Sequence, residues 1–350
     1  MRSPFENASV IDVFCGAGCL SHGFVAEGFS VECGIDVDEL CRHAFEFNND
    51  AEFLCRDVLD LNFSEVEARF IRNVPTILVG CAPCQPFSQY NVHNTDPKWV
   101  LVERFANLVE NIQPDVVSME NVPRLVSFKR GKIFRSFLRT LRAAGYQIVW
   151  RILNAYDYGV PQTRRRLVLI GSRLGMPHLP NPIDESEVDR SVFSAIAHLP
   201  ALQAGETDDN DPLHRARSLS PLNLSRIRAS KPGGSWHDWD KELLPTCYQR
   251  NSGRRYTAVY GRMEWNKPAP TLTTQFVNYG SGRYGHPTQD RAISLREGAI
   301  LQTIPLTYEL AKDETTINFS AMTRLIGNAV PVSLARALAS AIRDHLKELS

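Results

Sequence analysis

Strand-like and helix-like segments alternate through residues 9–172, and this alternation limits the fold more than any other feature of the sequence. Short apolar runs are separated by stretches whose apolar residues recur at helical spacing. Such alternation predicts an α/β fold: a doubly wound, mostly parallel sheet with helices on both faces. Ligands bind these sheets at the carboxyl ends of the strands. The expected strands are Ser9–Phe14, Ser30–Ile35, Thr76–Val79, Asp115–Met119, Gln147–Leu153 and Leu167–Ile170, and the expected helices are Leu20–Glu27, Glu39–Phe47, Glu65–Ile71, Leu101–Ile112 and Lys132–Ala144.

The pattern changes after Gly171, where a loop-rich region with many prolines and glycines begins. Helical periodicity returns near Arg296 and ends in a long final helix. A chain of 350 residues is long enough for two domains. We therefore expect the first part of a catalytic, cofactor-binding domain over 1–172, an irregular inserted domain over 173–285, and a return segment over 286–350 that completes the first domain.

The composition is that of an average soluble globular protein, with 43% hydrophobic and 22% charged residues. It excludes a disordered chain, a collagenous chain and a small disulfide scaffold. The longest apolar runs are the length of a strand, whereas a membrane span needs about 20 apolar residues, so we expect no membrane segment. Seven of the eight cysteines lie before residue 85, which indicates free thiols in a reducing compartment. Because no signal peptide fits before Val10, we expect a cytoplasmic protein.

The net charge is zero, but the charges are unevenly distributed. The stretch 212–296 contains 14 basic and 5 acidic residues, a local charge of +9. A basic stretch of this length is typical of contacts to phosphates. A solvated basic face would have the same composition, so charge alone does not decide between the two interpretations.

A tight glycine turn joins the first expected strand to the first expected helix, in the segment D-V-F-C-G-A-G-C-L-S at 12–21. Gly16 and Gly18 allow the backbone to approach a ligand closely, but the third glycine of the dinucleotide fingerprint is replaced by Ser21. Asp36 ends the second strand, where an acid can hold ribose hydroxyls, and Asp57 follows the short third strand. Together these residues predict a nucleoside-containing cofactor without a strong pyrophosphate site, although a glycine turn alone is often purely structural.

A proline-braced cysteine loop, G-C-A-P-C-Q-P-F-S at 80–88, directly follows the expected strand Thr76–Val79. A thiol at the carboxyl end of a strand is well placed to be a nucleophile. Cys81 and Cys84 form a C-x-x-C, but no second pair follows at metal spacing, so we expect a reactive thiol and no metal.

Charged residues lie at the end of the next strand and at the entry to a later one. Glu120 follows the apolar run 116–119 and opens into the same crevice, where it can act as an acid or a hydrogen-bond partner. In an extended chain Arg164 and Arg166 share one face and Arg165 lies on the other. The alternative for Glu120 is an acid that caps a helix, and the alternative for the arginines is a simple basic surface.

These segments, in this order, resemble the DNA cytosine-5 methyltransferase family of restriction–modification systems. The resemblance rests on D-x-F-x-G-x-G at 12–18, P-C-Q at 83–85, E-N-V at 120–122 and Q-x-R-x-R at 162–166. It continues through R-A-I-S-L-R-E at 291–297 and I-G-N-A-V-P at 326–331, and so spans nearly the whole chain. It implies a Rossmann-like methyltransferase fold, S-adenosylmethionine as cofactor with S-adenosylhomocysteine as product, and double-stranded DNA as substrate.

The family's residue roles carry over to the matching positions. Cys84 matches the nucleophile, Glu120 the acid that binds the cytosine, and Arg164 and Arg166 the paired arginines beside the target base. The positions implied around the cofactor are Phe14, Gly16, Gly18 and Leu20 at the methionine moiety, Asp36 at the ribose, Val37 stacked on the adenine, Asp57 and Val58 at the adenine edge, and Leu101, Asn328 and Val330 completing the pocket.

The chain departs from the family pattern at four places, none of which removes a chemical group from the mechanism. Cys19 replaces a glycine, and Val37 stands where a larger stacking residue is common. The segments 302–305 (Q-T-I-P) and 293–294 (I-S) replace Q-G-F-P and L-T.

The resemblance also implies a mechanism. Attack of the Cys84 thiolate on carbon 6 makes carbon 5 nucleophilic toward the methyl group, while Glu120 stabilises the charge on the ring. The arginines would orient the base and favour the thiolate. The cytosine has to be flipped out of the duplex, and the polar loop 88–98 is expected to close over it. The region 173–285 would be the target-recognition domain, and the candidate DNA-binding residues are Ser88, Arg250, Arg254, Arg255, Tyr256 and Gln275.

Three other functions remain open at the level of sequence. A tRNA cytosine-5 methyltransferase has the same catalytic residues, although the large basic insert favours DNA. A non-catalytic DNA-binding relative would keep only the fold, and an oxidoreductase using a nicotinamide cofactor is disfavoured by Ser21 and by the cysteine loop. We expect a monomeric enzyme, with any cognate restriction endonuclease acting separately.

Overall fold

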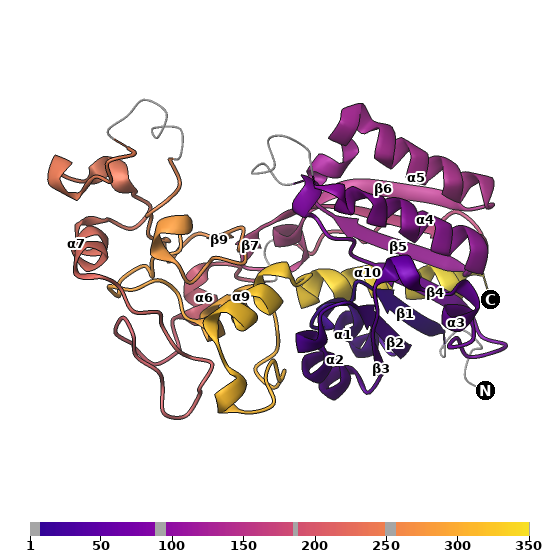
Figure 1. Ribbon diagram of the computed structural model, residues 1–350, viewed down its shortest axis with the longest axis horizontal. Coiled ribbons are helices and arrows are strands. Elements are labelled where there is room, and N and C mark those ends of the chain that lie inside the picture. The colour runs from indigo at the N-terminus through magenta and orange to yellow at the C-terminus, as the bar shows by residue number, and fades with distance from the viewer. Residues whose placement is uncertain (1–7, 88–95, 185–187, 249–256, 350) are drawn as a thin grey trace. The chain divides into compact units, whose positions relative to one another are not determined.

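The computed structural model describes residues 8–87, 96–184, 188–248 and 257–349, which form two compact units (Figure 1). Unit 1 is built from residues up to Tyr158, from Arg165–Ile183 and from Ala329 onward. Unit 2 is built from Gly159–Arg164 and Asp184–Asn328. The chain thus leaves unit 1 after residue 183 and returns to it at 329, whereas the sequence pattern placed these borders at 173 and 286.

The later return has a physical cause in buried polar contacts. Arg291 is fully buried and ion-pairs with Glu297 at 2.7 Å. Its Nε also donates to the carbonyl of Leu202 at 3.2 Å, and His214 Nδ1 lies 2.9 Å from Ser294 Oγ. A buried arginine must find such partners, and here they lie in residues 202–297. Residues 286–328 therefore fold with unit 2.

Unit 1 contains a seven-stranded sheet with the order β3-β2-β1-β4-β5-β8-β6. The pairs β1–β2, β1–β4, β2–β3 and β4–β5 are parallel, and β8 is antiparallel to β5 and β6. This confirms the predicted doubly wound, mostly parallel sheet. The strands are β1 Ser9–Val13, β2 Ser30–Asp36, β3 Glu52–Cys55, β4 Thr76–Gly80, β5 Val116–Asn121, β6 Gln147–Asn154 and β8 Arg165–Ser172.

Helices cover both faces of this sheet. Successive side chains along β1 point to opposite faces, and both faces are buried. Ile11 and Val13 belong to a core cluster that includes Phe105 of α4. Asp12, between them, points to the other face, where its Oδ2 accepts a hydrogen bond from Ser21 of α1 at 2.7 Å. The helices of unit 1 are α1 Cys19–Ala26, α2 Arg42–Asn49, α3 Phe63–Glu67, α4 Val100–Ile112, α5 Lys132–Ala143 and α10 Val332–Glu348.

Helix α3 is shorter than the helix expected over 65–71. The Asn62 side chain caps its first turn by accepting from the backbone N–H of Ser64 at 3.1 Å. Beyond Glu67 the backbone N–H groups of Arg69 and Phe70 bond three residues back, to Val66 and Glu67. Such tight turns end an α-helix.

The final helix, α10, packs against α1 and thereby completes unit 1. A Cβ atom on Gly23 would lie 2.4 Å from the Cβ of Ala335 and 2.6 Å from its carbonyl carbon, so the two helices approach at van der Waals distance. Glu27, just beyond α1, ion-pairs with Arg343 of α10 at 2.5 Å. His345 Nε2 lies 2.8 Å from Ser172 Oγ at the end of β8.

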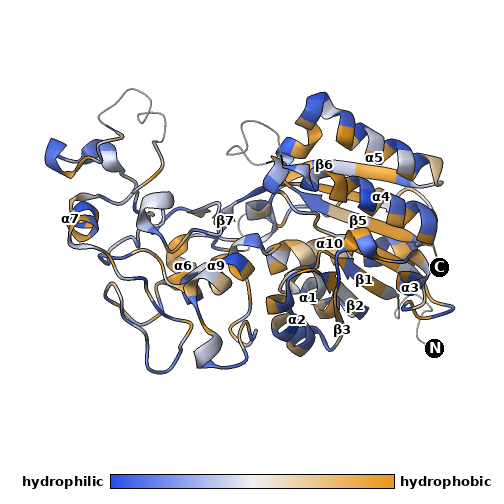
Figure 2. Cartoon of the chain, in the orientation of Figure 1, coloured by the Kyte–Doolittle hydropathy of each residue, from blue (hydrophilic) through white to orange (hydrophobic). Residues whose placement is uncertain are grey.

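Apolar residues are concentrated in the central strands of unit 1 and on the inner faces of its helices (Figure 2). The run Phe319–Glu348 has the length and hydropathy of a membrane span, but 72% of its apolar window is buried inside the structure. Most of this window is therefore packed inside the structure, as in the core of a globular protein, which makes its hydropathy weak evidence for a membrane.

Unit 2 has little regular structure, as expected for the inserted region. Its two short strands, β7 (Gln162–Thr163) and β9 (Ala269–Pro270), pair in parallel. Buried Arg262 supports the irregular backbone by donating to the carbonyls of Ile227, Ser230, His286 and Gln289. The helices of unit 2 are α6 Val192–Ile196, α7 Pro221–Ala229, α8 Leu295–Leu301 and α9 Phe319–Asn328.

We expect Gly23→Ala to lower the free energy of unfolding by about 1–3 kcal/mol, the usual cost of overpacking a core. The added methyl group would meet the backbone of α10, which cannot move aside as a side chain can. Urea denaturation measures the change. Ala26→Ser, at an exposed position of the same helix, is the control and should change stability by less than about 0.5 kcal/mol. A Gly23→Ala protein as stable as wild type would contradict the close helix contact.

Candidate active site

The strand order of unit 1 reverses between β1 and β4, because the chain winds from β1 toward β3 and then from β4 toward β5. Ligands in such sheets bind where the loops leave the carboxyl ends of these two strands. The loop after β1 contains the glycine turn, and the loop after β4 contains Cys81 and Cys84. The first two sequence signals therefore follow the two strands that flank the switch point.

The glycine turn bends the backbone sharply before α1. Gly16 and Gly18 have φ values of 52° and 84°, a left-handed conformation that favours glycine, and Gly18 immediately precedes the first residue of α1. A Cβ at Gly16 would meet no atom within 4 Å, so the turn faces open space. Phe14, with φ 64°, packs edge-to-face on Phe105 of α4 at 6.4 Å between ring centroids.

Asp36 braces this turn from the end of β2. Its Oδ2 accepts the backbone N–H of Gly16 at 3.0 Å, and its Oδ1 accepts that of Asp38 at 3.0 Å. Burial raises the pKa of the Asp36 carboxyl, while these hydrogen bonds oppose the rise. Each carboxylate oxygen can accept a second hydrogen bond, so the brace leaves capacity for a ligand.

The other predicted cofactor positions differ in exposure and in the part of the fold to which they belong. Val37 exposes 67% of its surface, and the Asp57 side chain caps the next turn by accepting from Leu59 N at 2.9 Å. Val58 and Leu20 are buried, and Leu101 is half-buried in the first turn of α4. Val330 belongs to unit 1, whereas Asn328 ends α9 in unit 2.

The cysteine loop is held against β1 and β5 by hydrogen bonds. The backbone N–H of Cys81 donates to the carbonyl of Val13 at 3.3 Å, and Asn121 Nδ2 donates to the carbonyl of Ala82 at 2.9 Å. The carbonyl of Cys84 accepts from Phe87 N at 2.9 Å, and Cys84 itself is half-buried. Cys84 is therefore fixed in a short turn while part of its surface stays exposed.

The carboxylate of Glu120 is buried at this end of the sheet and has a partner at each oxygen. Glu120 is 3% exposed; its Oε1 pairs with Arg166 Nε at 2.9 Å, and its Oε2 accepts from Cys81 Sγ at 2.9 Å. The three side chains come from the neighbouring strands β5 and β8 and from the loop after β4. The sequence indicated Glu120 and Arg166 but missed Cys81, whose only signal was its place in the C-x-x-C.

The three arginines at 164–166 alternate as the sequence predicts, with Arg164 and Arg166 buried and Arg165 exposed. Arg164, however, lies in unit 2, where its guanidinium donates to the carbonyls of Leu272 at 2.9 Å and Gly327 at 3.3 Å. The two buried arginines thus bind different partners, carbonyl oxygens for Arg164 and a carboxylate for Arg166.

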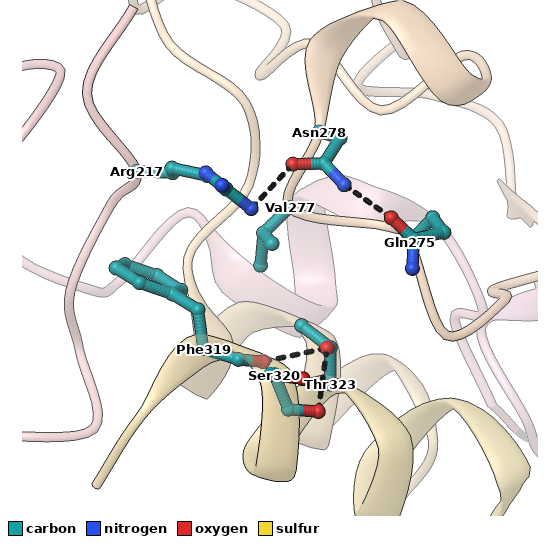
Figure 3. Close-up of a pocket in the computed structure, with 7 residues that line it drawn as sticks. All are labelled: Arg217, Gln275, Val277, Asn278, Phe319, Ser320 and Thr323. Atoms are coloured by element: carbon teal, nitrogen blue, oxygen red, sulfur yellow. Dashed lines mark hydrogen bonds between the residues drawn. The ribbon is translucent and has the colours of Figure 1, made fainter.

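Unit 2 contains a pocket of about 360 Å³ that includes Gln275, one of the predicted DNA-binding residues (Figure 3). Arg217 Nη1 donates to Asn278 Oδ1 at 2.8 Å, and Asn278 Nδ2 donates to Gln275 Oε1. Phe319, Ser320 and Thr323 of α9 line the opposite side. The sequence missed Arg217 and Asn278 because only the fold brings them to Gln275. The other candidates, Ser88, Arg250, Arg254, Arg255 and Tyr256, lie outside the described residues.

Residues 8–344 match the family model described as C-5 cytosine-specific DNA methylase. The chain belongs to this family. It is therefore a DNA (cytosine-5) methyltransferase, which transfers a methyl group to carbon 5 of cytosine in DNA, and membership of the family implies S-adenosylmethionine as the methyl donor. Within the described ranges, no group of three or more His, Cys, Asp or Glu side chains could hold a metal ion.

Individual relatives agree with this assignment. The methyltransferase is 45% identical over 342 residues to the Type II methylase M.HgiDII of Herpetosiphon aurantiacus, covering 97% of this chain and 96% of the relative. It is 28% identical over 357 residues to the Type II methyltransferase M.Sau96I of Staphylococcus aureus, covering 99% and 78%. Among solved structures, the methyltransferase EhMeth of Entamoeba histolytica superposes with a TM-score of 0.65 at 16% identity, covering 97% and 99%, which shows a shared fold.

The methyltransferase also buries an acid that sequence reasoning did not assign. Asp12 is fully buried in β1, and burial raises the pKa of its carboxyl from 3.8 to about 7, although the hydrogen bond from Ser21 opposes this rise. Ser21 is the residue that stands in place of the third glycine of the dinucleotide fingerprint, and its hydroxyl donates to the buried Asp12 carboxylate. The sequence signal for this buried acid was the position of Asp12, a charged residue, within an otherwise mostly apolar strand.

The raised pKa of Asp12 predicts a pH-dependent stability. The Asp12 carboxyl holds its proton more tightly in the folded state than in the unfolded state. Its contribution to the free energy of unfolding is therefore full below about pH 4 and is lost as pH rises through about 7. Relative to Asp12→Asn, which does not titrate, the wild type should lose about 3 kcal/mol of unfolding free energy between pH 5 and pH 8. Urea denaturation at both pH values tests this, and a difference that stays constant would show that Asp12 is ionised throughout.

Proposed function

We propose that this methyltransferase modifies one short sequence of double-stranded DNA, with Cys84 as its nucleophile, and that it is the modification enzyme of a type II restriction–modification system. The observation that carries the site is the buried Glu120 carboxylate, which is ion-paired through one oxygen with Arg166 and accepts a hydrogen bond from Cys81 through the other, beside the loop that bears Cys84. The type II names of the two relatives, one of them covered over 96% of its length, support the biological role.

The reaction needs a nucleophile because carbon 5 of cytosine is too electron-poor to take a methyl group directly. The Cys84 thiolate adds to carbon 6, and the ring's electron pair moves to carbon 5. Carbon 5 then accepts the methyl group. A base removes the proton from carbon 5, and the re-formed double bond expels Cys84. The half-buried turn at residues 84–87 suits a thiol that must reach a substrate and then release it.

Glu120 stabilises the charge that develops on the ring by hydrogen bonding at N3 and at the amino group. Such stabilisation is strongest when the group is already oriented in a site that excludes water. Arg166 supplies this orientation through its 2.9 Å ion pair. Arg164, held by two carbonyls of unit 2, is proposed to act beside the target base.

The corner of the sheet around the glycine turn fits S-adenosylmethionine, which supplies a methyl group on a positively charged sulfur and leaves as S-adenosylhomocysteine. The open space over Gly16 suits the methionine part, with Phe14, Gly18 and Leu20 nearby in the chain. The remaining lone pairs of Asp36 suit the ribose hydroxyls. For the adenine we propose the exposed side chain of Val37, with Asp57 and Val58 at its edge and Leu101, Asn328 and Val330 completing the pocket.

The pocket of unit 2 is proposed to read a base edge. Arginine and glutamine donors match the hydrogen-bond acceptors that purines present in the major groove. The relay from Arg217 through Asn278 fixes the amide of Gln275 with its oxygen bonded, which leaves Nε2 as a donor (Figure 3). The charge of +9 over 212–296 supports additional contacts to the phosphate backbone.

We further propose that the enzyme acts as a monomer in the cytoplasm, separately from any cognate endonuclease. We assign the target-recognition role to the inserted region, most of which lies in unit 2.

Replacement of the nucleophile tests the reaction. We expect Cys84→Ala to lower methyl transfer from labelled S-adenosylmethionine to unmethylated genomic DNA by about three orders of magnitude or more, because the covalent route is lost. Bisulfite sequencing of the wild-type product should show 5-methylcytosine at one short motif. Binding of S-adenosylmethionine by the variant is the control for folding.

Two outcomes would contradict the proposal. Equal transfer by Cys84→Ala and wild type would remove Cys84 from the mechanism. Transfer to tRNA in preference to duplex DNA would favour the alternative RNA substrate.

The base-reading pocket has its own test. Arg217→Ala and Gln275→Ala should each relax the sequence requirement at a single position of the motif, where a lost base contact corresponds to about 1–3 kcal/mol of discrimination. Deep sequencing of methylated sites in a randomised duplex library measures this. Lys267→Ala, an exposed residue paired with Glu264, is the matched control and should leave the motif unchanged. A motif unaltered in both pocket variants would place base reading elsewhere.

A further inference from the structure

Cys81 is a half-buried cysteine to which neither the family resemblance nor the proposed mechanism gives a role. Its Sγ lies 2.9 Å from Glu120 Oε2, whereas Arg166 pairs with Oε1. Both oxygens of Glu120 therefore have a partner, and each partner comes from a different part of the sheet.

The direction of this hydrogen bond follows from electrostatics. Burial, followed by the negative charge of Glu120, raises the pKa of the Cys81 thiol well above its ordinary value. The thiol is thus protonated, and its S–H donates to the carboxylate. A thiol in this state is a poor nucleophile.

A second hydrogen bond also joins the cysteine loop to β5, one residue further along the loop and one residue further along the strand. Asn121 Nδ2 donates to the carbonyl of Ala82 at 2.9 Å, in a fully buried contact. Consecutive residues of the cysteine loop, 81 and 82, therefore bind consecutive residues of β5, 120 and 121. This pairing sets the position of the loop that bears Cys84 relative to the carboxylate of Glu120.

We propose that Cys81 is a positioning residue for methyl transfer: its S–H holds the Glu120 carboxylate in a fixed rotation and ties it to the nucleophile loop. This inference rests on the roles proposed for Glu120 and Cys84. Without the donor, the carboxylate keeps only Arg166, and the free oxygen can rotate away from N3 and the amino group of the cytosine. Misplacement of a stabilising group lowers the rate of the chemical step more than it lowers substrate binding.

The kinetic test compares Cys81→Ala and Cys81→Gly, which remove the donor, with Cys81→Ser, which keeps an O–H. We expect the first two to lower kcat by about tenfold, corresponding to about 1.4 kcal/mol, with KM for S-adenosylmethionine unchanged. Cys81→Ser should recover kcat to within about threefold of wild type, since a hydroxyl donates to a carboxylate at similar range. Cys33→Ala is the control, because Cys33 is a buried cysteine of β2 whose Sγ donates to the backbone carbonyl of Gly34 and not to a carboxylate.

A spectroscopic test does not depend on activity. The infrared difference spectrum between wild type and Cys81→Ala isolates the S–H stretch of Cys81. Donation to a carboxylate should lower its frequency relative to the S–H band isolated with Cys33→Ala. Glu120→Gln replaces the charged acceptor by a neutral amide and should move the Cys81 band back to higher frequency.

The outcomes separate this inference from the proposed function. Wild-type kcat in both Cys81→Ala and Cys81→Gly, or an S–H band that ignores Glu120→Gln, would overturn the positioning role while leaving methyl transfer intact. Equal loss in Cys81→Ser and Cys81→Ala would show that side-chain shape matters and the donor does not. If wild-type protein transfers no methyl group, the proposed function fails, and the infrared band alone decides whether Cys81 holds Glu120.

Discussion

The negative charge of Glu120, buried almost completely in unit 1, is the interaction on which the arrangement of the active site depends. A carboxylate removed from water needs a cation and hydrogen-bond donors in place of its hydration shell. Arg166 and Cys81 meet this need only because β4, β5 and β8 lie side by side in the sheet. The strand order therefore decides which side chains can meet, and the chemistry at the carboxyl ends of the strands follows from it.

Much of unit 1 could be predicted because its signals are local. Apolar strands and helical periodicity depend on neighbouring residues, so the expected order of strands and helices matches the observed one within a few residues. Glu120 and the cysteine loop could be placed at one edge of the sheet for the same reason, since parallel strands end together. Arg166 followed from alternation along an extended chain, and it is buried while Arg165 is exposed.

The remaining features depend on contacts between residues far apart in the chain, and no local pattern reports these. The hydrogen bond from Cys81 to Glu120 joins residues 39 positions apart, and the relay from Arg217 to Asn278 joins residues 61 positions apart. The border at residue 329 was missed because the stretch 286–328 contains helices, like unit 1, yet is held in unit 2 by the buried pair of Arg291 and Glu297. Unit 2 has few regular elements, so hydrogen-bonded arginines such as Arg262 define its backbone where periodicity cannot.

The division of unit 1 into separated segments has a consequence for its biosynthesis. Helix α10, which packs on α1 through Gly23, is translated only after the whole of unit 2. Until residues 332–348 leave the ribosome, the face of α1 that carries Gly23 has no partner, and unit 1 exists as an incomplete domain. Unit 2, by contrast, is formed almost entirely by one continuous stretch of the chain. Catalytic competence, which needs a complete unit 1, therefore has to wait for the synthesis of unit 2 and of α10.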